Sequence, residues 1–166
     1  MMKLRFFFLI CSMCALAAGC SSKKVQDADS AKTVDTSISS DSMSFDPQGS
    51  DSGKIQGLHT IHFPFNRAAI EPAERELLAQ DAEWIKAHQK VSIQIEGNCD
   101  VSGSIEYNLA LGERRAKAAK DVLVSMGVNP AQLSTISYGK EKLITTDDSD
   151  VEQAKNRRDN FVPMAK

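Results

Sequence analysis

The sequence predicts an α/β sandwich, with helices packed on a mixed sheet and elements in the order β-α-β-α-β-α-β. Two observations predict it. Short segments in which apolar and polar residues alternate are separated by longer segments in which apolar residues recur at helical spacing. The region that carries these segments, residues 54–166, is long enough for one hydrophobic core.

The first half of this region is expected to hold a strand, a helix and a second strand. Apolar and polar residues alternate over 58–65, and Pro64 ends this strand. Pro72 suits the first turn of a helix, in which apolar residues recur at helical spacing as far as Ile85. Over 91–96, Val and Ile alternate with Ser, Gln and Glu, as in a strand with one buried face.

The second half is expected to hold two further helices and two further strands. The expected elements are a loop at 97–103, a helix at 105–126 that stops at Gly127, a strand at 133–138, a short helix at 151–156 and a last strand at Phe161-Val162. Because Pro cannot donate a ladder hydrogen bond, Pro163 confines the last strand to an edge or an end.

Residues 1–19 are typical of a secretory signal peptide. A basic start is followed by an apolar run at 6–18, which is too short to span a bilayer as a helix. Small residues at 17–19 precede Cys20 and resemble the lipobox of bacterial lipoproteins, in which this Cys is acylated with chains such as palmitate. The alternative is an ordinary signal peptide that leaves Cys20 free. Ser follows Cys20 where inner-membrane lipoproteins tend to have Asp, so we expect a lipid anchor in the outer membrane and a domain facing the periplasm.

Residues 20–53 are expected to form a disordered tether between the lipid and the domain. Residues 21–53 hold ten Ser and six Asp with few large apolar residues, too few to offset the entropy of the chain. Removing residues 1–19 takes two of the 20 basic residues, which leaves 18 against 22 acidic ones and a net charge of −4. This acidic balance argues against nucleic acid as a partner.

The sequence lacks the patterns of common hydrolases and of metal sites. We find no Ser-His-Asp or Cys-His order and no identifiable pair of catalytic acids. His59, His62 and His88 do not have metal-ligand spacing. Cys99 is the one Cys that remains after loss of the signal and modification of Cys20, and we interpret it as a small buried residue. We therefore expect no enzyme activity, no metal and no cofactor.

The run at 96–115, EGNCDVSGSIEYNLALGERR, is the most informative part of the chain. It places Asp100 in a tight polar loop directly before a helix. Asn108 and Arg115 lie seven residues apart, about two helical turns, and so share one face of that helix. A loop carboxylate near a helical guanidinium suits a ligand that carries both charges, such as the end of an amino acid.

Extended to residue 119, this run resembles the OmpA-like peptidoglycan-binding domain, whose pattern is close to G-H-x-D-x-x-G-x-x-x-Y-N-x-x-L-x-x-x-R-A. The matching residues are Gly97, Asp100, Gly103, Tyr107, Asn108, Leu111, Arg115 and Ala116. The runs SYGKEK at 137–142 and KNRR at 155–158 follow in the expected order, and GERRA with YGKEK is most similar to the peptidoglycan-associated lipoproteins. The chain differs from the pattern at three places: Asn98 replaces a His, Pro64 replaces a common acid, and Asp159-Asn160 stand where an apolar residue is usual.

The resemblance implies that the domain binds diaminopimelate, a residue of peptidoglycan stem peptides whose free end carries an ammonium and a carboxylate. It assigns the ammonium to Asp100 and a fork of hydrogen bonds to the carboxylate from Arg115. The ligand-binding residues that it implies are Asn66, Asp100, Ser102, Asn108, Arg115 and Arg157. Ser102 and nearby loop amides lie before a helix N-terminus, where anions are favoured. A lysine-type peptide lacks the distal carboxylate and would leave Arg115 unpaired.

Two of these residues have a structural interpretation that the sequence leaves open. Asp100 could cap the loop or the following helix, because Asp is common at such positions. Arg157 could belong to a structural ion pair.

The resulting hypothesis is a non-catalytic anchor, with acylated Cys20 in the outer-membrane lipid and the domain on diaminopimelate-type peptidoglycan. The resemblance also implies proteins of the Tol system as partners, in envelope constriction during cell division. The alternatives are a peptidoglycan-remodelling enzyme and an accessory OmpA-like envelope lipoprotein that acts outside the Tol system.

Overall fold

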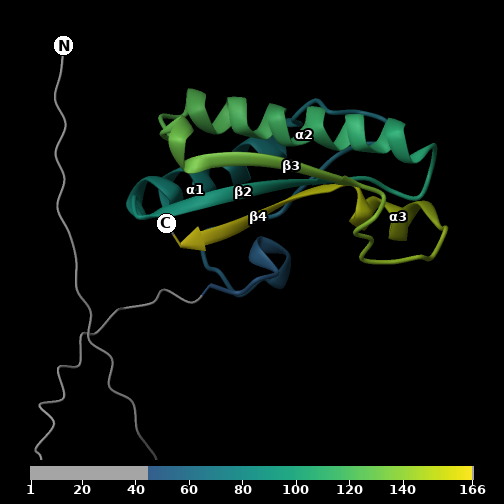
Figure 1. Ribbon diagram of the computed structural model, residues 1–166, viewed down its shortest axis with the longest axis horizontal. Coiled ribbons are helices and arrows are strands. Elements are labelled where there is room, and N and C mark those ends of the chain that lie inside the picture. Colours follow the sequence, from purple (N-terminus) through teal and green to yellow (C-terminus); the bar gives the residue numbers. More distant parts are fainter. Residues whose placement is uncertain (1–44, 166) are drawn as a thin grey trace, which may run out of the picture. The chain divides into compact units, whose positions relative to one another are not determined.

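The computed structural model describes residues 45–165. Within these residues, the apolar side chains of the helices and of the strands pack into one core. The elements are η1 (Gly49–Ser52), β1 (Ile61–His62), α1 (Pro72–Ala87), β2 (Val91–Asn98), α2 (Ile105–Ser125), η2 (Pro130–Gln132), β3 (Leu133–Gly139), α3 (Asp150–Asn156) and β4 (Arg158–Ala165) (Figure 1). The β-α-β-α-β-α-β order expected from the sequence is confirmed, with two short 3₁₀ turns (η) added. The expected signal peptide, Cys20 and most of the expected tether lie outside the described residues.

The four strands form one mixed sheet in the order β1-β4-β2-β3. β4 is antiparallel to both of its neighbours, whereas β3 is parallel to β2. The last strand along the chain therefore lies inside the sheet, between the first strand and the second.

β1 is much shorter than the strand expected over 58–65. The backbone N–H of His59 donates to the Asp81 carboxylate at 2.8 Å, so it is not available to a strand neighbour. At the other end, Phe63 still donates to the carbonyl oxygen of Arg157 at 2.8 Å, but Pro64 has no N–H with which to continue the ladder. Two residues, Ile61 and His62, are left as regular strand.

β4 is longer than the expected Phe161-Val162. Its polar start at 158–160 pairs with β1 and β2, although it carries no apolar alternation that would indicate a strand. β1 reaches only Arg158 and Asp159, so β4 has β2 as its single strand neighbour at Pro163. Pro163 therefore lies on a locally open edge, as the missing N–H requires.

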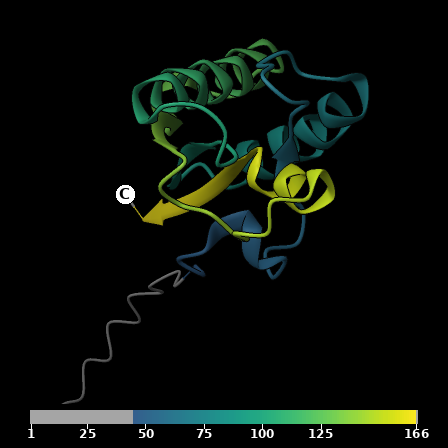
Figure 2. The same ribbon diagram turned by 90° about the vertical axis from the view of Figure 1, so that its right-hand side faces the viewer.

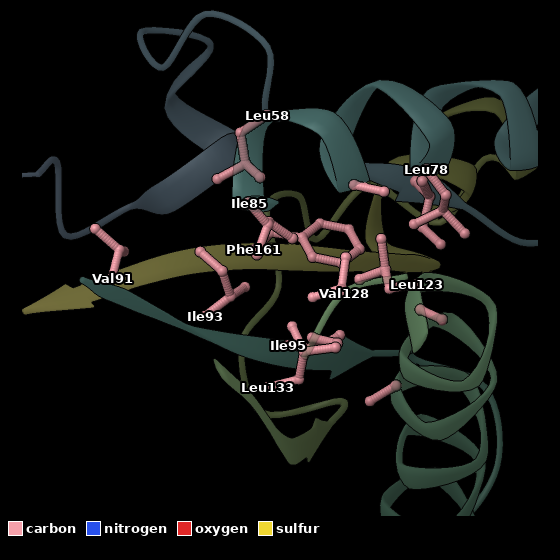
Figure 3. Close-up of a cluster of buried hydrophobic side chains, with 14 of the residues drawn as sticks. Leu58, Leu78, Ile85, Val91, Ile93, Ile95, Leu123, Val128, Leu133 and Phe161 are labelled. Atoms are coloured by element: carbon pink, nitrogen blue, oxygen red, sulfur yellow. The ribbon is translucent and has the colours of Figure 1, made fainter. Parts of the chain in front are cut away.

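Two helices cover one face of the sheet and bury the core against it. Figures 1 and 2 show α1 and α2 on the same side of the strands. The labelled core side chains in Figure 3 are Leu58, Leu78, Ile85, Val91, Ile93, Ile95, Leu123, Val128, Leu133 and Phe161. α2 approaches β2 closely at Gly112, where a Cβ on Gly97 would overlap the Gly112 carbonyl oxygen. Glycine at both positions thus lets the helix lie directly on the strand.

Residues 45–53, which the sequence assigned to the tether, pack on the opposite face of the sheet (Figure 2). The buried Ser50 hydroxyl donates to Asn160 Oδ1 at 2.9 Å, and the Asp51 carboxylate accepts from Arg158 Nε at 2.8 Å. These contacts are polar, so a count of apolar residues does not reveal them. Residues 45–53, upstream of the expected boundary at residue 54, therefore belong to the described fold.

Asp81 on α1 is a carboxylate inside the core, with no exposed surface. Its Oδ1 accepts the backbone N–H of His59 and lies 2.8 Å from His59 Nδ1. Its Oδ2 has no hydrogen-bond partner within residues 45–165. Burial raises the pKa of Asp81 to about 6, although the bonds from His59 act in the opposite direction.

We expect Asp81→Asn to remove part of the pH dependence of stability. The folded protein binds the Asp81 proton more tightly than the unfolded chain does, so this contribution is present below about pH 4 and is lost as the pH rises through about 6. The wild type should lose about 2–3 kcal/mol of unfolding free energy over that interval relative to Asp81→Asn. Urea unfolding at a series of pH values measures the difference, and parallel pH profiles for the two proteins would contradict it.

Candidate functional site

A small pocket opens at the end of the sheet where β1 and β2 finish and α2 begins. Figure 1 shows α3 and the start of α2 at this same end. The pocket encloses about 120 Å³ and is lined by Phe65, Asn66, Cys99, Asp100, Ser102, Gly103, Tyr107, Asn108, Leu111 and Arg115. Of the six residues implied by the resemblance, all but Arg157 line it.

Arg115 forms the floor of the pocket and has no exposed surface. Its Nε donates to the carbonyl oxygen of Arg67 at 2.8 Å, and its Nη2 donates to that of Pro64 at 3.2 Å. Its Nη1 donates to the carbonyl oxygen of Asn98 at 2.9 Å. The guanidinium carbon also lies 4.8 Å from the centroid of the Phe63 ring. One side chain thus joins the segment after β1 to the end of β2.

These bonds change what Arg115 offers to a ligand. A guanidinium has five N–H donors. Three of them donate to the carbonyl oxygens, and a fourth, on Nη1, makes a weaker contact to Cys99 Sγ at 3.6 Å. One Nη2 hydrogen is left, so a ligand carboxylate would meet a single donor and a positive charge instead of the expected fork. Burial lowers the pKa of Arg115, but a guanidinium remains charged in proteins.

Asp100 forms a polar wall of the pocket, and two bonds fix its position. Its Oδ1 accepts the backbone N–H of Ser102 at 3.1 Å, and its Oδ2 accepts from Arg157 Nη1 at 3.2 Å. Arg157 is itself held by donation from its Nε to the Phe63 carbonyl oxygen at 3.2 Å. Arg157 therefore lies behind Asp100 as a structural ion pair, the alternative that the sequence left open. An ionised carboxylate has lone pairs to spare, so Asp100 can accept further hydrogen bonds.

Asn108 ties the loop to α2. Its Nδ2 donates to the carbonyl oxygen of Ser102 at 2.6 Å and to that of Ser104 at 3.0 Å. The Ser104 hydroxyl accepts the Tyr107 N–H at 3.1 Å, so Ser104 is the N-cap of α2 and Asp100 is not. Because both Nδ2 hydrogens are in use, the side-chain oxygen of Asn108 is the group that it can offer to a ligand.

Two of the loop amides expected to favour an anion are already paired. The N–H of Val101 donates to Gln153 Oε1 at 3.1 Å, and that of Ser102 donates to Asp100. Ser102 lies on the exposed rim of the pocket, where its hydroxyl is the polar group available. The N–H groups of Val101 and Ser102 are therefore not available to an anion, and anion binding by the rest of the loop stays a prediction.

Asn66 and two aromatic residues form the rest of the rim. Asn66 has a positive φ of 56°, which Asn adopts more readily than most residues, and its Oδ1 accepts from the Tyr107 hydroxyl. Phe65 is 61% exposed and Tyr107 is 46% exposed. The sequence did not single out Phe65, and it indicated Tyr107 only as a match to the family pattern. The signal that could have identified Phe65 is the position of an aromatic residue between Pro64 and Asn66 in the turn after the strand.

Two buried residues at the end of β2 complete the structure of the pocket. Cys99 is a buried free cysteine, as expected, and burial raises the pKa of its thiol to about 11. Asn98, which stands where the resembling pattern has His, is fully buried and donates from Nδ2 to the Glu96 carbonyl oxygen at 2.9 Å. Its amide thus braces the strand end that accepts from Arg115.

The described part of the chain holds no group of three or more His, Cys, Asp or Glu side chains placed to bind a metal ion. Within the same residues, no helix is both long enough and apolar enough to cross a membrane. The fold and the small charged pocket together define the class of this domain: an α/β sandwich with a candidate ligand site at the end of its sheet.

The chain belongs to the OmpA family, whose model matches residues 62–157. It is 35% identical over 160 residues to the peptidoglycan-associated lipoprotein of Pseudomonas putida, an alignment that covers 95% of this chain and 96% of that protein. The crystal structure of the peptidoglycan-associated lipoprotein from Burkholderia pseudomallei has a TM-score of 0.62 and 37% identity, covering 63% of this chain and 89% of that one. The C-terminal domain of Helicobacter pylori MotB also has a TM-score of 0.62, with 28% identity over 66% of this chain and 87% of that one. These similarities confirm the expected fold.

Proposed function

We propose that this protein is an outer-membrane lipoprotein that holds the outer membrane to peptidoglycan without catalysis. The main support for this proposal is that a buried cation, Arg115, and a fixed anion, Asp100, face one small pocket. It occurs in a chain that aligns along nearly its whole length with a peptidoglycan-associated lipoprotein. The ligand of this pocket is the free end of diaminopimelate in a stem peptide.

The polar groups of the pocket complement those of an amino-acid end. The Asp100 carboxylate and the side-chain oxygen of Asn108 are acceptors for an ammonium. The remaining Nη2 hydrogen of Arg115 is a donor for the carboxylate, and burial strengthens that contact because water does not screen it. Asn66 and Ser102 add polar groups at the rim. A lysine-type peptide offers no carboxylate to Arg115, and leaving a buried charge without its anion is the basis of selectivity.

Weak binding at one pocket is sufficient for an anchor. A lipid on Cys20 would confine many copies of the domain to the layer in which the polymeric ligand lies. Confinement raises the effective concentration of each site for its ligand, so the attachment is strong without a tight single contact. Proteins of the Tol system are proposed partners from the family alone, because no surface of the described residues identifies them.

We expect Asp100→Asn to weaken binding to purified peptidoglycan sacculi by about ten- to hundredfold. The change keeps the shape that meets Arg157 and Ser102 but removes the charge that meets an ammonium, and a charge-assisted hydrogen bond contributes about 1.5–3 kcal/mol. Sedimentation of the protein with sacculi measures the retention. A soluble peptide ending in diaminopimelate should compete, and the same peptide ending in lysine should compete poorly.

Asp121→Asn is the matched control. It removes the same charge from an exposed position near the far end of α2, where the pair with Lys117 contributes little. Retention of Asp100→Asn equal to that of the wild type and of Asp121→Asn would exclude the pocket as the binding site.

We expect Cys20→Ser to release the protein from the membrane. Without a thiol there is no acyl chain, and each CH₂ buried in lipid contributes about 0.8 kcal/mol. Fractionation after digestion of peptidoglycan with lysozyme separates lipid anchoring from binding to sacculi, and Ser22→Ala serves as the control. A Cys20→Ser protein that stays with the outer membrane would contradict the proposed anchor.

A further inference from the structure

Asp159 is a buried carboxyl group to which the proposed function gives no role. It has no exposed surface, and neither of its oxygens has a hydrogen-bond partner among the described residues. Burial of such a group is costly unless an opposite charge compensates it. Arg158 and Asn160 contact residues 50–51 on one face of the sheet, so Asp159, like the core residue Phe161, faces the helices.

The guanidinium of Arg115 lies over β4 at this position. It donates to the Pro64 carbonyl beyond β1 and to the Asn98 carbonyl at the end of β2, and β4 lies between those two strands. Asp159 is the β4 residue opposite Gly97, which directly precedes Asn98. Because adjacent strands lie about 4.8 Å apart, the Asp159 carboxyl group and the Arg115 guanidinium are electrostatic neighbours under the floor of the pocket.

We propose that Asp159 is the counter-charge of Arg115 in the unliganded protein, and that it takes up a proton from solvent when a ligand carboxylate reaches Arg115. The inference rests on the proposed function. A carboxylate at the free Nη2 hydrogen brings a second anion to the same buried cation. Two anions close together in a medium of low dielectric constant repel one another, and protonation of Asp159 relieves that repulsion. Asp159 is therefore a positioning residue that makes ligand affinity depend on pH.

The surroundings of Asp159 favour its uptake of a proton when the ligand binds. Burial raises the pKa of Asp159 well above its ordinary range, while Arg115 and Arg158 act in the opposite direction. The other charged or titratable groups around Asp159, on either face of the sheet, are Glu113 on α2, Cys99 and Asp100 after β2, Arg157 and Arg158 beside and within β4, and His62 on β1. Arg157 and Arg158 are paired with Asp100 and Asp51. His62, whose pKa burial lowers, pairs in register with Arg158 and so lies toward the opposite face.

Titration calorimetry of the full-length protein with the tripeptide L-alanyl-γ-D-glutamyl-meso-diaminopimelate tests the proposal. Heats measured in buffers of different ionisation enthalpy between about pH 5 and about pH 8 give the number of protons taken up. The alanine N-terminus of the peptide is acetylated for this purpose, because a free α-amino group would itself titrate in this interval. The wild type should take up as much as about one proton per peptide, with affinity rising as the pH falls. Asp159→Asn should take up none and bind with an affinity that does not depend on pH. Asp81→Asn, which changes a buried acid away from the pocket, should retain the wild-type uptake.

Each outcome separates the inference from the function on which it rests. A wild type that does not bind the tripeptide overturns the proposed function as well as the inference. Binding without proton uptake at any of these pH values, or with equal uptake by Asp159→Asn, overturns the inference alone. If Asp159→Asn does not fold, the ¹³C chemical shift of the Asp159 carboxyl in the wild type, followed with and without peptide, reports its protonation directly. A shift that binding leaves unchanged at every pH overturns the inference.

Discussion

The buried guanidinium of Arg115 is the contact on which the pocket depends. It donates to carbonyl oxygens at Pro64, Arg67 and Asn98, which belong to two segments more than thirty residues apart in the chain. No carboxylate within residues 45–165 hydrogen-bonds to it, so carbonyl dipoles, the Phe63 ring and a nearby buried acid replace the water that it loses on folding. The buried guanidinium is stable only when all of these groups are in place around it. The floor of the pocket therefore forms together with the fold.

The same arrangement separates the two charges that a zwitterionic ligand requires. The positive charge comes from the floor, where α2 crosses the strand ends, and the negative charge comes from Asp100 in the loop before α2. Arg157 holds Asp100 from behind and Asn108 holds the loop backbone, so neither charge needs to be reoriented when a ligand arrives. Such preorganisation lowers the entropy cost of binding. It would also help a pocket this small to hold its ligand in the proposed function.

The sequence predicted the elements that local periodicity encodes. The sequence predicted the boundaries of three elements to within two residues: the helices at 72–87 and 105–125 and the strand at 91–98. Their apolar spacing, and the Pro, Ser and Gly residues at their ends, are local signals. The grouping of Asp100, Asn108 and Arg115 also followed from helix register. The polar start of β4 and the packing of Ser50 and Asp51 could not be predicted, because each depends on partners about one hundred residues away.

The roles of the site residues were harder to predict than their positions. Helix register places Arg115 on the right face, but only the folded chain shows that backbone carbonyls use most of its donors. In the same way, composition does not reveal that Arg157 stands behind Asp100 and outside the pocket. Long side chains reach several groups from one backbone position, so the sequence fixes their charge and leaves their partners to tertiary structure.

Hydrogen exchange of the Arg115 Nε–H, followed by NMR, tests the central claim that this guanidinium is locked into the fold. The exposed side chain of Arg75 in the same protein serves as the internal reference. The Arg115 Nε–H should exchange as slowly as the most protected backbone amides of β2, because both require global unfolding to open. Exchange as fast as that of Arg75 would show that Arg115 samples solvent freely, and would contradict the account.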